Sequence, residues 1–155
     1  MFRGHFEHAI DAKGRTSVPA RFRDVLAATG DAPATGDPRV IITKSPFDAC
    51  LHLLPMKGWE EIEAKIAAQP QFDPHVIRLR RMYISAAVEC EIDGSGRLLV
   101  PGALREYASL HKDVLWAGMG NMVELWSREK WDETQKMTPE ELVEFRRVVS
   151  EQLRI

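Results

Sequence analysis

The feature that most constrains this chain is an internal repeat. Residues 10–19 align with residues 92–101, and position 93 lies 82 residues after position 11. Six of the ten aligned positions are identical, namely Ile, Asp, Gly, Arg, Val and Pro in the same order. The similarity continues past the proline in two matched pairs, Phe22 with Leu104 and Arg23 with Arg105. Such a repeat predicts two similar structural units that pack against each other.

Each copy has the same expected order of elements. A strand of alternating apolar and polar residues leads into an Asp-x-x-Gly turn and a second short strand. A short helix follows, with a proline that suits its first turn. Two more strands complete the copy. The expected strands are 6–10, 15–18, 40–43 and 50–54 in the first copy, and 88–92, 97–100, 114–117 and 122–126 in the second. A unit of roughly 45–50 residues is too small to be stable alone, so the copies must share one core.

The segments outside the repeats have helical patterns. Apolar residues recur at helical spacing over 59–66 and 74–85, and Trp59 matches Trp131 as a residue expected to pack onto the core. The sequence Thr138-Pro139-Glu140-Glu141 predicts the start of a helix that has an apolar stripe. This stripe could pack within the chain or against a neighbouring subunit, and the sequence does not separate the two. The first copy has about ten additional residues, which we assign to a loop rich in Gly and Pro at 28–38.

We therefore expect an α+β protein with a single pseudo-symmetric core. Its parts are a first repeat at 7–54, a helical connector at 55–86, a second repeat at 87–130 and C-terminal helices at 131–155. No run of 18 apolar residues is present, and the N-terminus lacks the apolar segment of a secretory signal. We expect a cytosolic protein with no membrane partner.

Metal ligands and cofactors are not expected from the sequence. Cys50 and Cys90 lie too far apart for a Cys-x-x-Cys site and are interpreted as small core residues. His52, His75 and His111 share no spacing typical of metal ligands. We therefore predict neither a metal nor a cofactor.

The repeated turn is the candidate functional element. It has Lys13 and Arg15 in the first copy and Arg97 in the second, and residues 3–23 contain five basic and two acidic side chains although the whole chain has a net charge of −2. A hairpin can enter the DNA major groove, where arginine recognises guanine through two hydrogen bonds. The same residues could also form a purely structural turn in which Asp and Arg are paired.

These residues resemble the MraZ family of bacterial transcriptional regulators, within the SpoVT/AbrB-like superfamily. The similar motifs are Phe2-Arg3-Gly4, Asp11–Arg15, Val18-Pro19-Ala20 with Arg23, and Asp93–Arg97 with Pro101. The resemblance implies a swapped-hairpin β-barrel built from both repeats and flanked by helices. It also implies ring-shaped homo-oligomers that bind short direct repeats of double-stranded DNA upstream of a division and cell-wall gene cluster.

The resemblance and the residue types together give a set of candidate site residues. The expected DNA contacts are Lys13, Gly14, Arg15, Ser95, Arg97 and Arg3, and the expected turn-shaping residues are Asp11, Asp93 and Gly96. Ser95 stands where the first copy has Lys13, so the second loop is less basic. We predict a repressor of its own gene cluster, located in the cytoplasm at the nucleoid.

Two other classes of function compete with a DNA-binding regulator. An enzyme is not expected, because no nucleophile–base pair, phosphate-binding loop or metal-ligand set accompanies the repeated Asp and Arg. An antitoxin-like or scaffold protein on the same fold remains the alternative, although two repeats and an ordered C-terminal helix argue against it. Salt-dependent DNA binding would separate a regulator from both.

Overall fold

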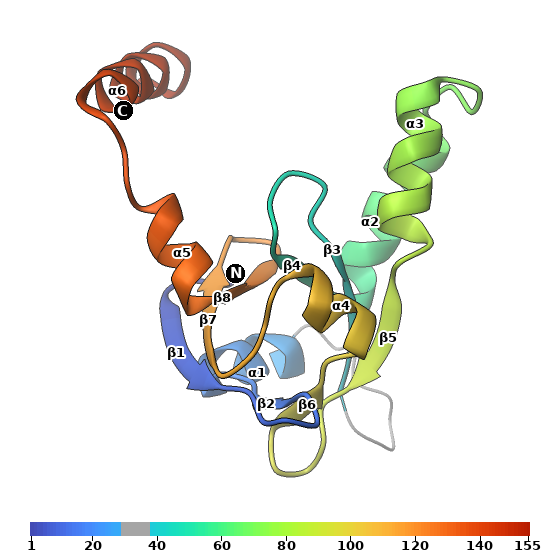
Figure 1. Ribbon diagram of the computed structural model, residues 1–155. Helices are drawn as coiled ribbons and strands as arrows, with labels where there is room; N and C mark the ends of the chain where they lie inside the picture. Colours follow the sequence, from blue (N-terminus) through green and yellow to red (C-terminus); the bar gives the residue numbers. More distant parts are fainter. Residues whose placement is uncertain (29–37) are drawn as a thin grey trace.

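The computed structural model describes residues 1–28 and 38–155, and Figure 1 shows the arrangement of its elements. The loop expected at 28–38 therefore lies almost wholly outside the described residues. Each repeat contains four strands and one helix, as the repeated pattern predicted. The first repeat comprises β1 (His5–Ala9), β2 (Arg15–Ser17), α1 (Ala20–Ala28), β3 (Arg39–Lys44) and β4 (Leu51–Pro55). The second comprises β5 (Val88–Glu91), β6 (Arg97–Leu99), α4 (Gly102–Tyr107), β7 (Asp113–Gly118) and β8 (Val123–Ser127).

Helices connect and follow the two repeats. The connector consists of α2 (Met56–Ala67), α3 (Pro74–Leu79) and the π-helix η1 (Arg80–Ile84), and the C-terminal part consists of α5 (Arg128–Thr134) and α6 (Pro139–Leu153). The repeated prolines lie one residue before α1 and α4 rather than inside them, and Pro101 is the N-cap of α4. No helix in the described part of the chain is long and apolar enough to cross a bilayer.

The two repeats exchange strands. Six antiparallel strands form one sheet in the order β1-β7-β8-β4-β3-β5, and β2 pairs with β6 in a second, two-stranded sheet. The first strand of each repeat thus pairs with the third strand of the other, β1 with β7 and β5 with β3. The central β4–β8 pair also joins the repeats. Neither repeat can therefore complete its sheet alone, which agrees with the expectation of one shared core.

The protein has a mixed α+β fold, but the expected closed barrel is not found among the described residues. The edge strands β1 and β5 of the larger sheet do not pair with each other. Only single bridges, Ile10 with Thr16 and Ile92 with Leu98, link their ends to the β2–β6 pair. The strands β2 and β6 have three residues each, which is too short to extend a continuous ladder around a barrel.

The shared core lies between the two sheets and beneath α1 and α4. Phe22 from α1 and Leu104 from α4 are 1% and 2% exposed, and they occupy matching positions in the two repeats. The rings of Phe2 and Phe6 pack edge-on against Phe22, with centroids 5.6 and 5.3 Å away. A second cluster contains Ile41, Leu54, Trp59 and Tyr83, and partly buried residues of α2 and η1 pack against it.

Helices α3 and α6 project on the same side of the molecule, away from the β2–β6 pair (Figure 1). The N-cap predicted for α6 is confirmed, because Thr138 Oγ1 accepts a hydrogen bond from the Glu141 backbone N–H at 3.1 Å. No α6 residue is buried, and its apolar Val143 and Phe145 are 67% and 51% exposed. Among the residues that the structure describes, nothing fully buries the C-terminal apolar stripe.

Candidate nucleic-acid interface

The first repeated turn is held closed by Asp11. Its Oδ1 accepts hydrogen bonds from the backbone N–H groups of Lys13 at 3.0 Å and Arg15 at 2.9 Å, and its carbonyl oxygen accepts from Gly14 N–H at 3.0 Å. Gly14 has φ of +93°, a conformation that glycine adopts without steric cost. Arg15 Nε donates to Asp11 Oδ2 at 2.7 Å. The paired structural turn considered from the sequence is thus present, and it holds the guanidinium group of Arg15 through Nε.

The second turn repeats this geometry with one difference. Asp93 Oδ1 accepts from the backbone N–H groups of Ser95 at 2.8 Å and Arg97 at 2.9 Å, and Gly96 has φ of +78°. However, Arg97 Nε lies 3.7 Å from Asp93 Oδ2, which is too long for a hydrogen bond. This Nε has no hydrogen-bond partner among the residues that the structure describes. The guanidinium group of Arg97 is therefore held less tightly than that of Arg15.

Both turn aspartates are stabilised in the ionised form. The backbone N–H of Arg15, followed by its guanidinium group, lowers the pKa of Asp11 below its ordinary value. The backbone N–H of Arg97 is the main cause that lowers the pKa of Asp93, and the positive charge of Arg15 also contributes. The charge of Arg15 therefore acts on both turns, which lie close together although they are far apart in sequence.

The β2–β6 pair places both arginines on one face. This two-stranded pair of β2 and β6 is called the ribbon below. Arg15 pairs with Leu99 and Ser17 with Arg97, so the two arginines are diagonal neighbours across the ribbon. Diagonal neighbours of an antiparallel pair are roughly 7–8 Å apart. The central residues Thr16 and Leu98 are 1% and 0% exposed, because they point into the core. Since side chains alternate along a strand, Arg15 and Arg97 point outward together.

Two further arginines lie against the turns, each from the opposite repeat. A Cβ atom at Gly14 would lie 2.6 Å from Arg105 Nε, and one at Gly96 would lie 2.7 Å from Arg23 Nη1. Arg105 also donates from Nε to the carbonyl oxygen of Val100 at 3.1 Å. The repeat pairs Arg23 with Arg105 in the sequence, but neither was predicted as a site residue. Their recurrence at matched positions was the signal that could have identified them.

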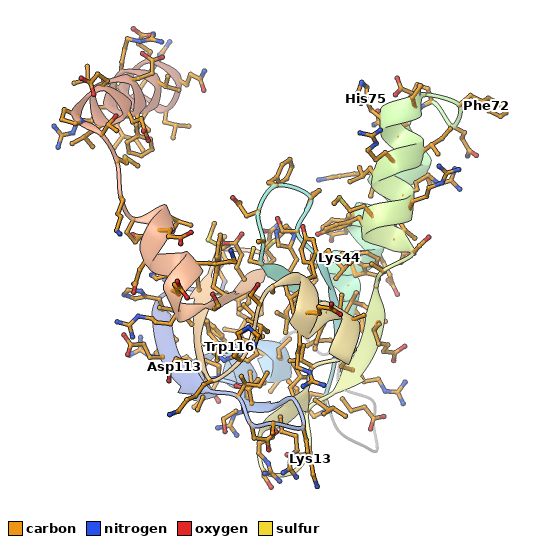
Figure 2. All side chains as sticks on the ribbon, in the orientation of Figure 1. Lys13, Lys44, Phe72, His75, Asp113 and Trp116 are labelled. Carbon is orange, nitrogen blue, oxygen red and sulfur yellow. The ribbon has the colours of Figure 1, made fainter. Side chains whose placement is uncertain are left out.

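This end of the molecule is basic. Figure 2 shows Lys13 at the tip of the first turn, on the side opposite the projecting helices. The two turns and the arginines against them contribute five positive side chains, Lys13, Arg15, Arg23, Arg97 and Arg105, and two negative ones, Asp11 and Asp93. This local excess of positive charge suits a polyanionic ligand, although the whole chain has a net charge of −2.

The structure brings together most of the expected contact residues. Lys13, Gly14, Arg15, Ser95 and Arg97 all belong to the two turns or the ribbon. Arg3 does not join them, because its backbone lies against Gly118 at the opposite end of β1 from Asp11. The sequence could not reveal this separation, since Arg3 and Lys13 both belong to the basic segment 3–23 and the distance between them depends on the length of β1.

The fold and the site define a class of protein in which two repeats exchange strands. Each repeat contributes one Asp-x-x-Gly-Arg turn to a shared two-stranded ribbon. A family model described as "MraZ protein, putative antitoxin-like" matches residues 1–81 and 83–145. The chain belongs to the MraZ family, as the resemblance predicted.

Similar proteins from several bacteria have the name "Transcriptional regulator MraZ". The protein from Moorella thermoacetica is 41% identical over 141 residues, which cover 91% of each chain. That from Anaeromyxobacter dehalogenans strain 2CP-C is 40% identical over 147 residues, covering 94% of this chain and 98% of the relative. That from Marinomonas sp. strain MWYL1 is 42% identical over 132 residues, covering 85% and 83%.

Proposed function

We propose that this protein is a transcriptional regulator that binds double-stranded DNA sequence-specifically through the β2–β6 ribbon and its two turns. One observation carries the proposal: Arg15 and Arg97, from different repeats, lie on the same outward face of one two-stranded ribbon. The printed name of the relatives, transcriptional regulator, supports the same reading. The uncompensated positive charge of the turns gives the attraction to phosphate that such binding requires.

The ribbon has dimensions suited to the major groove. That groove is about 12 Å wide and admits a two-stranded β-ribbon. Arg15, oriented by its hydrogen bond to Asp11, contacts a guanine edge, and Lys13 at the turn tip contacts phosphate. Arg97, which is less tightly held, contacts the adjacent half of the site. Asp11 and Asp93 hold the turns rather than contact DNA, because a carboxylate repels phosphate.

Multivalent binding completes the proposed mechanism. A single small module buries only about 600–1,000 Å² of protein surface on DNA, so one ribbon binds weakly. In our proposal the protein assembles into a ring whose ribbons bind successive short direct repeats, which raises the effective concentration of each ribbon. The exposed apolar residues of α6 support such self-association. Occupying repeats upstream of its own division and cell-wall gene cluster blocks polymerase and represses transcription.

The test is a fluorescence-anisotropy titration on DNA from upstream of the protein's own gene, at two salt concentrations. Wild type should bind this DNA more tightly than scrambled DNA, and binding should weaken at the higher salt. Arg15→Ala should weaken specific binding by about 1–3 kcal/mol, the loss expected for one bidentate guanine contact. The matched control is Arg128→Ala, which removes an arginine of α5 that is also paired with carboxylates and whose side chain, like that of Arg15, is 41% exposed.

The outcomes separate the proposal from its alternative. Weaker specific binding in Arg15→Ala and Arg97→Ala, with Arg128→Ala unchanged, supports recognition by the ribbon. If wild type does not bind DNA even at low salt, the proposal is wrong. An antitoxin-like or scaffold role, in which the turns are purely structural, then becomes the better reading, and the words "putative antitoxin-like" in the family description point the same way.

A further inference from the structure

Three potential metal ligands meet where the two repeats join. Cys50 immediately precedes β4, His52 lies in β4, and Glu124 lies in β8, directly opposite His52 in the strand register. Cys50 is 0% and His52 6% exposed, and the side chain of Glu124 is 12% exposed. The cluster lies outside the DNA-facing ribbon, and the proposed function does not use it.

The distances between the ligand atoms suit a small divalent cation. Cys50 Sγ lies 3.7 Å from Glu124 Oε2, and His52 Nε2 lies 3.6 Å from the same oxygen. One ligand atom from each residue lies within 4.8 Å of the others. Tetrahedral zinc, with Zn–S of about 2.3 Å and Zn–N and Zn–O of about 2.0 Å, separates its ligand atoms by roughly 3.3–3.5 Å. Zinc binding therefore shortens the two distances to Glu124 Oε2 by a few tenths of an ångström, and it brings the cysteine sulfur and the histidine nitrogen from within 4.8 Å to about 3.5 Å of each other.

Neighbouring side chains orient two of the ligands. His52 Nδ1 lies 2.8 Å from the Tyr83 hydroxyl, so a proton on Nδ1 leaves Nε2 free to bind a metal. Trp126 Nε1 donates to Glu124 Oε1 at 3.1 Å, which leaves Oε2 facing the cysteine and the histidine. Such outer partners are typical of protein metal sites, where they fix the orientation of the ligands.

The charges of these groups also suit a divalent cation. Glu124 supplies a carboxylate oxygen, Oε2, that lies between the cysteine sulfur and the histidine nitrogen. A cysteine binds zinc as the thiolate. When zinc binds, its bond to sulfur replaces the S–H bond and the proton leaves to solvent. One thiolate and one carboxylate then neutralise the ion.

We propose that Cys50, His52 and Glu124 bind one zinc ion. A thiolate, an imidazole and a carboxylate form a ligand set that zinc accepts, and water takes the fourth position. Because Cys50 and His52 belong to the first repeat and Glu124 to the second, the ion fastens the repeats together at the β4–β8 pair. The sequence predicted no metal, because its cysteines and histidines share no spacing typical of metal ligands. Glu124 follows His52 by 72 residues, and only the strand register brings them together.

The experiment uses the full-length protein, first treated with chelator and then titrated with Co²⁺ as a spectroscopic probe for the zinc site. One equivalent should bind and produce the near-ultraviolet charge-transfer absorption of a cobalt–thiolate bond, and Zn²⁺ should displace it. Cys50→Ser should abolish this absorption. Cys90→Ser is the matched control, since Cys90 is also a buried cysteine of the core but is not part of the three-residue group.

A second variant keeps the test decisive if Cys50→Ser does not fold. Tyr83→Phe retains the buried ring but removes the hydroxyl that orients His52, and should lower zinc affinity about 10- to 100-fold. Native mass spectrometry of wild type should show one zinc per chain. The proposal is overturned if wild type binds no stoichiometric metal, or if Cys90→Ser removes the cobalt–thiolate absorption and Cys50→Ser does not. DNA binding by the ribbon is measured separately and does not depend on this result.

Discussion

The guanidinium group of Arg105 occupies the space that a side chain at Gly14 would need. Arg105 Nε and Cζ lie 2.6 and 2.8 Å from the position of a Cβ atom on Gly14, and the Gly14 carbonyl oxygen accepts a hydrogen bond from Val100 N–H at 2.8 Å. Arg23 has the equivalent relationship with Gly96. Each turn is therefore held by a helix residue of the other repeat, so the geometry of the two turns is coupled.

The glycines of the second turn give the first prediction. Gly96→Ala should destabilise the fold by about 1–2 kcal/mol, because an L-residue is strained at φ of +78°, and it should also weaken DNA binding, because the new Cβ displaces Arg23. Gly94→Ala is the matched control within the same turn, since a Cβ there has no atom within 4 Å. Urea unfolding and DNA anisotropy check both variants. Equal effects of the two substitutions would contradict the relationship between Arg23 and Gly96.

Two buried threonines should respond in opposite directions to the same substitution. Thr16 Oγ1 is buried and has no hydrogen-bond partner among the described residues, so Thr16→Val should stabilise the protein by about 1 kcal/mol. Thr43 Oγ1 donates to the Tyr83 carbonyl oxygen at 2.6 Å, so Thr43→Val should cost about 1–3 kcal/mol. Chemical denaturation measures both values. A loss of stability in Thr16→Val would show that its hydroxyl has a partner, such as an ordered water.

The turn aspartates should make the stability of the fold fall at acidic pH. Their pKa values are lower in the folded state than the ordinary value of about 3.9 that applies in the unfolded chain. Their contribution to stability is therefore fully present above that value and is lost as the pH falls through the folded-state pKa. Carboxyl ¹³C titration by NMR should give midpoints below the ordinary value for Asp11 and Asp93.

A variant distinguishes the causes of the Asp11 shift. The backbone N–H of Arg15 is the largest cause and survives in Arg15→Ala, whereas the guanidinium contribution is removed. The midpoint of Asp11 should therefore rise in Arg15→Ala but stay below its ordinary value. A return to the ordinary value would mean that the side chain, rather than the turn backbone, holds the carboxylate.

The exposed face of α6 should control self-association. Phe145 is 51% exposed on a helix with no buried residue, so Phe145→Glu should leave the unfolding free energy unchanged within about 0.5 kcal/mol. If α6 contributes to the proposed ring, the same variant should shift sedimentation to smaller species. Met119→Glu is the control, because Met119 is 53% exposed but lies outside α6. An unchanged assembly in Phe145→Glu would exclude this face from the subunit contacts.

The features that the sequence determined by itself are local. The repeated turn follows from an Asp that accepts hydrogen bonds from N–H groups two and four residues later, and from a Gly that adopts positive φ. The start of α6 likewise depends on Thr138 and a residue three positions later. The repeat as a whole predicted two similar units with one core, because neither is large enough to be stable alone.

The features that only the tertiary structure decided depend on partners far apart in the chain. Strand register pairs β1 with β7, leaves the sheet short of a closed barrel, and sets His52 opposite Glu124. Helix packing brings Arg105 onto Gly14, while the length of β1 carries Arg3 away from the turns. A hydrogen bond between neighbours can be predicted from the residues that make it. A contact between strands of different repeats is fixed only when the whole core selects one register, since a shift of one residue would turn every buried side chain outward.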